Sequence, residues 1–291
     1  MVRLSNAKTR SETGFEHVLQ SISIMTPFGK KRMKGMAPFM PGEEERLDAE
    51  YRKLEEMLEL VEENPRTVDM LKETLMDIKE IGFTVERSGS GALSTVELFE
   101  VKSLLLKMKR IIELLAETGR QLSEEFVLTD TEKLLDTLDP RKDRMYTFYI
   151  YDEFSETLAA LRKRKRELEI AIRKAQKELK QQIASRYGIT LTPRFDYVVS
   201  KSNKELVKII KEIPELTTGD EDHLSVTFVL KNTEEIDAFL RETDALNERI
   251  DEEELAIREK LSKEVFRFRD ILLENCEKIG ELDFTLAKAI Y

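Results

Sequence analysis

FSETLAALRKRKRELEIAIRKAQKELKQQIASR, residues 154–186, is the stretch that decides the fold class, because it carries one uninterrupted helical pattern. Its apolar positions recur at steps of three and four, with Lys165 filling one of them; they are Phe154, Leu158, Leu161, Leu168, Ile172, Ala175 and Leu179. This heptad spacing is typical of helices that pair along a seam. At about 1.5 Å per residue the helix is roughly 50 Å long, too long to be buried in one small domain.

A second long helical pattern begins at Asn232 and runs to about Leu282, with a break expected near Gly280. Its seam comprises Ile236, Leu240, Thr243, Ile250, Ile257, Leu261, Phe268, Leu272, Ile279 and Leu286. Residues 162–186 carry ten Lys or Arg against three Glu, a net of +7, whereas residues 232–291 carry nine against seventeen, a net of −8. Opposite charges and matching seams predict that the two helices pair.

The basic run Arg162–Arg166 is interpreted first as partner charge for the acidic residues Asp251–Glu254 of the return helix. A nucleic-acid patch is the alternative interpretation of the same run. The segment between the two helices is too long for a simple hairpin loop. The chain is therefore expected to go out along the first helix, form a small cap and return along the second. Antiparallel pairing follows from this connectivity.

The segment between the helices changes character. Residues 195–199 and 224–230 are rich in β-branched and aromatic side chains, which predicts two strands. A short helix is predicted at residues 203–213, and a turn at residues 219–222. The chain is therefore expected to carry a small strand-containing insert at the tip of the helix pair.

The residues before the first long helix predict shorter helices. Phe15–Ile22 is amphipathic and is expected to end near Thr26-Pro27, and Val68–Ile81 forms another helical pattern. Residues 82–93 are expected to form a flexible turn around Ser88-Gly89-Ser90-Gly91.

Two further helices of this part have clear signals. Glu43–Glu63 carries an apolar stripe at the helical spacing, made of Leu47, Tyr51, Leu54, Leu58 and Val61. Ser94 and Glu97 have the spacing of a capping box, which predicts a helix that continues to Gly119.

Composition limits the class of protein. The chain has 291 residues, of which 41% are hydrophobic and 36% charged, a balance that favours long helices with large solvated faces. A net charge of −10 argues against a purely electrostatic nucleic-acid binder. No apolar run is long enough to span a membrane, and no signal peptide is expected at the start. A single cysteine, Cys276, fits a reducing environment, so we expect a cytoplasmic protein.

No motif in the sequence indicates catalysis. The chain has no Gly-x-x-x-x-Gly-Lys-Ser/Thr phosphate loop, and its two histidines, His17 and His223, have no ligand partner at metal-binding spacing. We therefore expect this chain to have no catalytic residue, no bound cofactor and no metal site.

The order of several short motifs resembles the MutS family of DNA mismatch-repair and related ATPases. Residues 195–203, FDYVVSKSN, resemble the family's clamp strand, which ends in a Thr/Ser-Lys-Ser-Asn pattern and follows a long outgoing helix. Residues 279–287, IGELDFTLA, resemble the close of the family's core region, where a Leu-Asp-hydrophobic pattern leads into the ATPase domain. Gly29 with Pro38, and residues 91–100, GALSTVELFE, are similar to the shorter subfamily that lacks the mismatch-reading domain.

The resemblance covers about residues 13–291 and implies a mainly α fold: an elongated helical core, two long antiparallel lever helices and a small α+β clamp at the tip. The implied divisions are listed in chain order: a disordered N-terminus at 1–12, the helical core at 13–150, the outgoing lever at 151–187, the clamp with short strands at 188–231, and the return lever with the end of the core at 232–291.

The resemblance also implies a function. The chain would be the non-catalytic lever and clamp portion of a DNA-binding ATPase, gripping mismatched, branched or non-specific DNA in a homodimer. ATP and Mg²⁺ would be bound by an ATPase domain that would begin where this sequence stops, at Tyr291. An alternative is a MutS-like remodelling or adaptor factor whose clamp binds a protein partner. No membrane partner is expected.

Five cations are candidates for phosphate contacts in the implied clamp: Arg194, Lys201, Lys204, Lys208 and Lys211. Residues 188–231 hold six Lys or Arg against seven acidic residues, so DNA binding by this segment alone is expected to be weak. A solvated helix face is the competing interpretation of the Lys201–Lys211 run.

Overall fold

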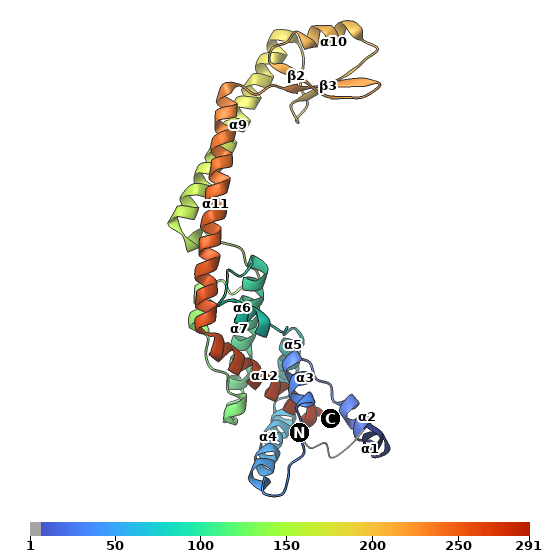
Figure 1. Cartoon of the computed structure of the whole chain (residues 1–291), viewed down its shortest axis with the longest axis vertical. Helices are drawn as coiled ribbons and strands as arrows, with labels where there is room; N and C mark the ends of the chain where they lie inside the picture. The colour runs from blue at the N-terminus through green and yellow to red at the C-terminus, as the bar shows by residue number, and fades with distance from the viewer. Residues whose placement is uncertain (1–6) are drawn as a thin grey trace. The chain divides into compact units, whose positions relative to one another are not determined.

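The computed structural model describes residues 7–291 and is mainly helical, with one small antiparallel sheet in that range (Figure 1). It divides into two units. The helical unit comprises the described residues up to Tyr151 together with Ala256–Tyr291, and the sheet-bearing unit comprises Asp152–Leu255. Helix α11 (Glu234–Arg267) contributes residues to both. The prediction of a mainly helical chain with a small strand-containing segment is confirmed at this level.

The helical unit is built from short and medium-length helices. In chain order they are α1 (Ala7–Glu12), α2 (Phe15–Ser21), α3 (Pro27–Lys34), α4 (Glu44–Glu63), α5 (Pro65–Met76), α6 (Gly82–Arg87), α7 (Thr95–Glu117), α8 (Glu132–Leu138) and α12 (Arg269–Ile290). The capping box that the sequence predicts is present at the start of α7. The Ser94 hydroxyl accepts from the Glu97 amide at 3.2 Å, and the Glu97 carboxylate accepts from the Ser94 amide at 2.8 Å.

Three local predictions differ from the structure in the first hundred residues. Of the stretch 1–12 predicted to be disordered, residues 1–6 lie outside the described range and residues 7–12 form α1. Pro27 begins α3 instead of only ending the preceding helix, because a proline at the first helical position loses no hydrogen bond. The expected flexible turn at 82–93 contains α6, and Ser88 within it is buried.

The return pattern also breaks at a different place. The sequence places the break near Gly280, but α11 ends at Arg267 and α12 starts at Arg269, so the break lies at Phe268. Gly280 lies inside α12, where it allows close packing. A Cβ at Gly280 would come within 2.9 Å of the backbone carbonyl of Phe28 in α3, so only a glycine permits this approach.

Helix α12 organises the helical unit, since it contacts α3, α4 and α6 and is buried from Ile279 to Ala287. The Asp283 carboxylate accepts hydrogen bonds from the amide and the hydroxyl of Thr26, both at 2.7 Å. The Thr26 hydroxyl in turn accepts from the Gly29 amide at 2.9 Å. Because Thr26 is the N-cap of α3, Asp283 places a negative charge at the positive end of that helix.

A second polar contact joins α12 to α4. The Lys53 ammonium lies 2.6 Å from one oxygen of the Glu281 carboxylate, and the Arg32 guanidinium donates to the other. All three groups are at least partly buried, with only 10% of the Glu281 side chain exposed. Burial alone would raise the pKa of Glu281, but the hydrogen bonds from Lys53 and Arg32 outweigh it and lower that pKa below its usual range.

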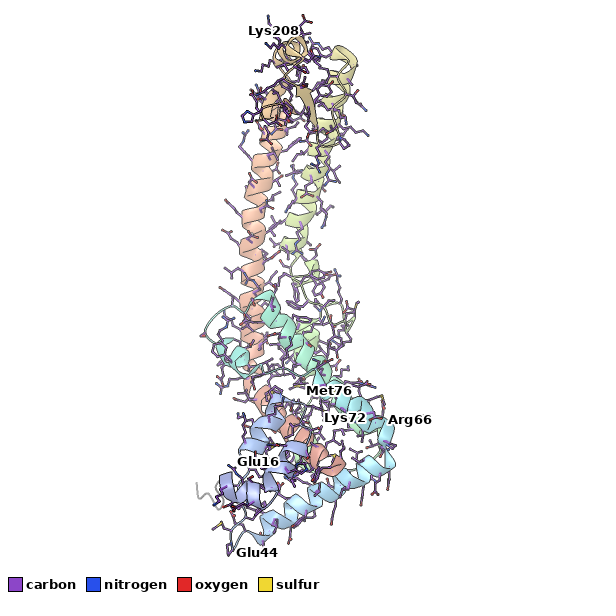
Figure 2. The ribbon with its side chains drawn as sticks, turned by 90° about the vertical axis from the view of Figure 1, so that its right-hand side faces the viewer. Glu16, Glu44, Arg66, Lys72, Met76 and Lys208 are labelled. Carbon is purple, nitrogen blue, oxygen red and sulfur yellow. The ribbon has the colours of Figure 1, made fainter. Side chains whose placement is uncertain are left out.

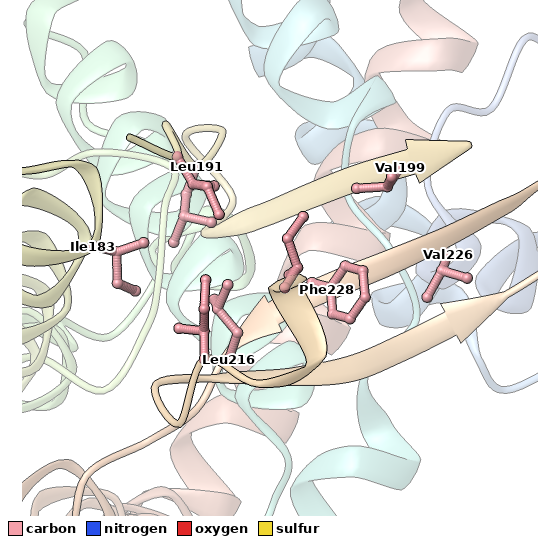
Figure 3. Packing of buried hydrophobic residues seen from close by; sticks show 9 residues of the cluster. Ile183, Leu191, Val199, Leu216, Val226 and Phe228 are labelled. Atoms are coloured by element: carbon pink, nitrogen blue, oxygen red, sulfur yellow. The ribbon is translucent and has the colours of Figure 1, made fainter. Parts of the chain in front are cut away.

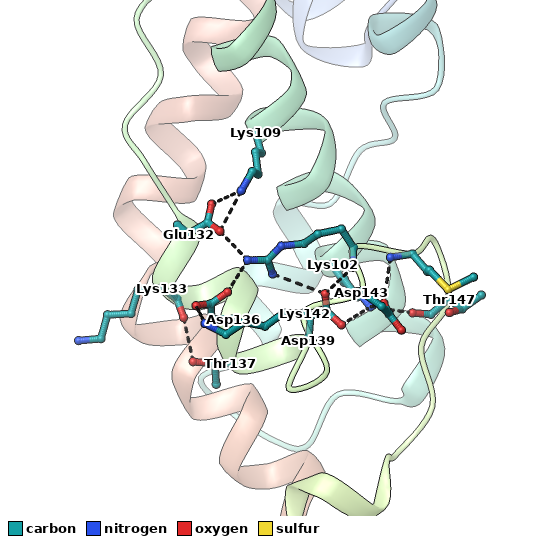
Figure 4. A network of polar contacts seen from close by, with 12 residues as sticks. Lys102, Lys109, Glu132, Lys133, Asp136, Thr137, Asp139, Lys142, Asp143 and Thr147 are labelled. Atoms are coloured by element: carbon teal, nitrogen blue, oxygen red, sulfur yellow. Dashed lines mark hydrogen bonds and ion pairs between the residues drawn. The ribbon is translucent and has the colours of Figure 1, made fainter.

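A third polar cluster holds the last loop of the helical unit, residues 139–151, on α7 (Figure 4). Lys102 is fully buried, and its ammonium donates to the Asp139 carboxylate and to the Thr147 carbonyl, both at 3.1 Å. Asp139 is also fully buried and accepts from the Arg144 amide at 2.9 Å. Burial would raise the pKa of Asp139, but the bonds from Arg144 and Lys102 lower it.

Truncating this lysine should be costly. Lys102→Ala leaves a buried carboxylate without its main counter-charge, so the free energy of unfolding should fall by about 3–5 kcal/mol. The loss can be measured by urea unfolding in which labelling of the buried Cys276 thiol is the probe. Cys276 is the only cysteine in the chain and lies in the helical unit, so the signal reports on that unit. Lys133→Ala, which removes an exposed lysine from α8, is the matched control and should change the midpoint little. An equal loss of stability in the two variants would contradict the conclusion that the buried Lys102 ammonium stabilises the helical unit.

The Glu281 contact should make stability depend on pH. A carboxylate whose pKa is lowered by folding contributes stability above its unfolded pKa, and this contribution is lost as the pH falls through the folded value. Glu281→Gln should therefore be less stable than the wild type at neutral pH, and the difference should narrow below about pH 4.5. Urea unfolding by far-UV circular dichroism at several pH values tests this. Glu62→Gln, at an exposed position of α4, is the control, and a difference that does not change with pH would contradict the prediction.

Candidate nucleic-acid interface

The sheet-bearing unit contains two long helices, α9 (Glu156–Tyr187) and the first part of α11. They lie side by side in Figures 1 and 2. The seam of α9 is buried at Leu158, Leu161, Leu168 and Ile172, as its heptad spacing predicts. Two ion pairs cross from the basic to the acidic helix. Arg162 lies 2.6 Å from Glu254, and Arg164 lies 2.8 Å from Glu242. These two arginines of the basic run therefore act as partner charge for α11.

The sheet has three antiparallel strands in the order β1-β3-β2: β1 (Asp196–Ser200), β3 (Ser225–Leu230) and β2 (Leu216–Glu221). The sequence predicts β1 and β3 and the helix between them, which is α10 (Lys204–Lys211). It misses β2 and assigns part of it to a turn, because Gly219 and its acidic neighbours resemble a turn. Their polar side chains are tolerated because β2 is an edge strand and is exposed after its first residue.

One face of the sheet is closed by a small apolar core (Figure 3). Val199 pairs with Val226, and Tyr197 with Phe228, so these four side chains share that face. The core is completed from the end of α9 and from α10, and its buried members are Ile183, Ile189, Leu191, Val199, Ile210, Ile213, Leu216, Val226 and Phe228. The sheet is thus held to the helices by hydrophobic burial.

Because one side of α10 is buried against the sheet, the opposite side, which carries lysines, is exposed to solvent. Asn203 caps the helix, accepting from the Leu206 amide at 3.2 Å, and Ile210 is fully buried. Lys204, Lys208 and Lys211 are exposed, at the three- and four-residue spacing that places them on one face. Figure 2 shows Lys208 projecting outward from α10. Lys204 and Lys208 have no ion-pair partner within the described residues.

The other two candidate cations occupy different settings. Lys201 follows β1 and lies 2.7 Å from the Glu221 carboxylate on β2. This contact, with a smaller contribution from Lys211, lowers the pKa of Glu221. Arg194 precedes β1, so the whole strand separates it from Lys201. The structure brings Lys204, Lys208 and Lys211 together on α10, directs Lys201 to an acidic neighbour and places Arg194 at the other end of the strand.

The hairpin between β2 and β3 is acidic, a feature that the charge count alone does not locate. The Asp222 carboxylate accepts from the amides of Leu224 and Ser225, both at 2.6 Å, which orders the turn. Leu224 is 80% exposed at its tip, and His223 is exposed as well. A phosphate approaching the sheet edge would meet negative charge at this hairpin, whereas α10 offers positive charge.

Two further features of the helical unit are a buried thiol and a cavity. Burial raises the pKa of Cys276 to about 12, so its thiol stays protonated at neutral pH. A cavity of about 850 Å³ lies in the helical unit between α3 and α12, lined by side chains of both charges. In the range 7–291 no three His, Cys, Asp or Glu side chains gather to hold a metal ion, and no helix there could span a membrane.

Comparison with protein-family models finds no match for this chain, and comparison with curated protein sequences finds none either.

The apolar core of the sheet generates a local prediction. Phe228→Ala should destabilise the sheet by about 3–5 kcal/mol, because it removes a fully buried ring at the centre of the core. Hydrogen exchange should show lost protection in β1, β3 and α10, with protection of α12 unchanged. Val198→Ala, at a side chain of β1 that is 57% exposed, is the control. Loss of protection throughout the chain would show that the sheet does not unfold as a local unit.

Proposed function

We propose that this chain grips nucleic acid as the core, lever and clamp portion of a MutS-like ATPase. In this proposal α9 and α11 are the levers, and the three-stranded sheet with α10 is the clamp. The observation that carries it is a pair of lysines, Lys204 and Lys208, which lie one turn apart on the exposed face of α10 and have no ion-pair partner among residues 7–291. The motif order 195–203 and 279–287 supports the family assignment.

The chemistry of the clamp favours contacts with the phosphate backbone. An ammonium on an exposed helix face can neutralise a phosphate and release a counterion, with no requirement for a particular base. Two or three such contacts give weak, salt-sensitive binding. Tight grip would then need two clamps acting together, which fits the dimer and the controlling ATPase domain that the proposal includes.

The prediction concerns the salt dependence of DNA binding. Lys204→Gln/Lys208→Gln should lower affinity on the order of tenfold at moderate salt and reduce the slope of log affinity against log salt by about two, for all sequences alike. Fluorescence anisotropy with labelled duplex and branched DNA over a salt series measures both quantities. Lys260→Gln/Lys263→Gln, at exposed positions of α11, changes the net charge equally and is the control.

Two results would count against the proposal. An equal loss in both double variants would show that net charge, and not the α10 face, controls the interaction. Absence of salt-dependent binding by the wild type, with a protein partner captured through the same segment, would favour the second candidate: a MutS-like adaptor whose clamp holds a protein. The acidic hairpin Asp220–Asp222 is the feature that favours this second candidate.

A further inference from the structure

Helix α4 buries a different face from the one that its apolar pattern suggests. Lys53, Met57 and Leu60 are its buried residues, and they face α12 and the neighbouring helices. The apolar stripe lies about 100° round the helix from this face, at 3.6 residues per turn. Its members are Leu47, Tyr51, Leu54, Leu58 and Val61.

Two of the five stripe residues are left exposed in the described part of the chain. Tyr51 is 57% exposed and Leu58 is 40% exposed, and the other three members are only half-buried. The four-three-four-three spacing continues for the length of the helix, which is the pattern of a seam for a second helix. The segment before α4 adds to the apolar surface, with Phe39 37% and Met40 44% exposed.

A row of carboxylates borders the stripe on its solvent side. Asp48, Glu55 and Glu62 recur every seven residues, and each lies three or four positions from Tyr51 or Leu58. All three are exposed, and within the described residues none has an ion pair. On the opposite border, Glu50 is already paired with Lys53 and Arg32. At the positions that directly flank the stripe, the unpaired charge is therefore negative, while the exposed Arg52 lies further round the helix, beyond the carboxylates.

This charge pattern decides between possible occupants. If two copies of α4 paired antiparallel, their rows of carboxylates would face each other and repel. In a parallel pair the row would face Glu50 and Met57, neither of which is a cation. A helix that carries Lys or Arg beside its own apolar seam would instead satisfy both the apolar stripe and the row of acids.

We propose that the stripe of α4 is a docking surface for a basic amphipathic helix of a partner protein. Apolar side chains of the partner would cover Tyr51 and Leu58, and its cations would pair with Asp48, Glu55 and Glu62. This helix-on-helix mode gives affinity through apolar burial and orientation through the flanking charges. The proposal concerns a surface of the helical unit and is independent of nucleic-acid binding by α10.

The probe is a synthetic helix of roughly three heptads with Leu at the seam positions and Lys at the flanking positions. Its fluorescent form is titrated with the whole chain. A peptide with Glu in place of Lys, and a scrambled peptide of the same composition, test the requirement for charge and for spacing. The wild type should bind the Lys peptide at least tenfold more tightly than either of the other two.

Two variants of the chain separate the contributions. Tyr51→Ser/Leu58→Ser removes apolar surface from exposed positions, and Glu55→Lys/Glu62→Lys reverses charge beside it. Each should weaken binding of the Lys peptide at least tenfold while leaving the circular dichroism spectrum unchanged. Asp251→Lys/Glu252→Lys on α11 makes the same change in net charge at exposed, unpaired positions and should keep most of the affinity.

Three outcomes would overturn the proposal. Equal weakening by the α11 control would show non-specific attraction of a basic peptide to an acidic chain. Equal binding of the scrambled peptide would show that the seam spacing is irrelevant. Concentration-dependent dimerisation in sedimentation, abolished by Tyr51→Ser/Leu58→Ser, would identify a second copy of this chain as the occupant.

Discussion

The contact between α12 and α3 is the constraint on which the helical unit depends. Asp283 reaches from α12 to the N-terminal end of α3 and accepts from Thr26 and from the Met25 amide, so one carboxylate satisfies three donors. The close approach that this requires is possible only because Gly280 and Gly29 have no side chain. A Cβ on Gly29 would lie 2.3 Å from the Asp283 carboxylate. The geometry of the stretch 279–287 is therefore constrained by its packing against α3.

Sequence reasoning succeeds where one local rule determines the structure. The capping box at Ser94 marks the start of α7, and the heptad spacing of α9 identifies its buried seam. It fails where a distant residue decides. Gly280 resembles a helix break until Phe28 is known to lie against it, and the burial of Lys102 depends on a carboxylate 37 residues away. Within the candidate site, the shared face of the α10 lysines can be predicted from their spacing. The ion pair of Lys201 cannot, because its partner Glu221 lies on β2, the strand that the sequence does not predict.

The same limit explains the two faces of α4. The apolar pattern of the sequence selects the stripe through Tyr51 and Leu58, because hydrophobicity is a local signal. The fold buries the face with Lys53 instead, because the ammonium pairs with Glu281 on α12. A buried lysine opposite a buried glutamate carries no helical-period hydrophobic signal, so this inward face could not be identified from the sequence alone. The strong apolar pattern is left on the surface of the described part of the chain, with Tyr51 and Leu58 exposed.

Exposed charges of opposite sign gather on different helix faces in this chain: lysines on α10 and carboxylates on α4. A net charge of −10 would repel a polyanion at long range, so a nucleic-acid grip has to rely on short-range contacts by a few lysines. Near α10, the Glu221 carboxylate is paired with Lys201, and Lys204 and Lys208 have no ion-pair partner among the described residues. On α4 the reverse holds: Lys53 pairs inward with Glu281, and Asp48, Glu55 and Glu62 are exposed, with no ion pair among the described residues. The two surfaces therefore suit ligands of opposite charge, and a phosphate backbone on α10 and a basic helix on α4 would not compete for the same side chains.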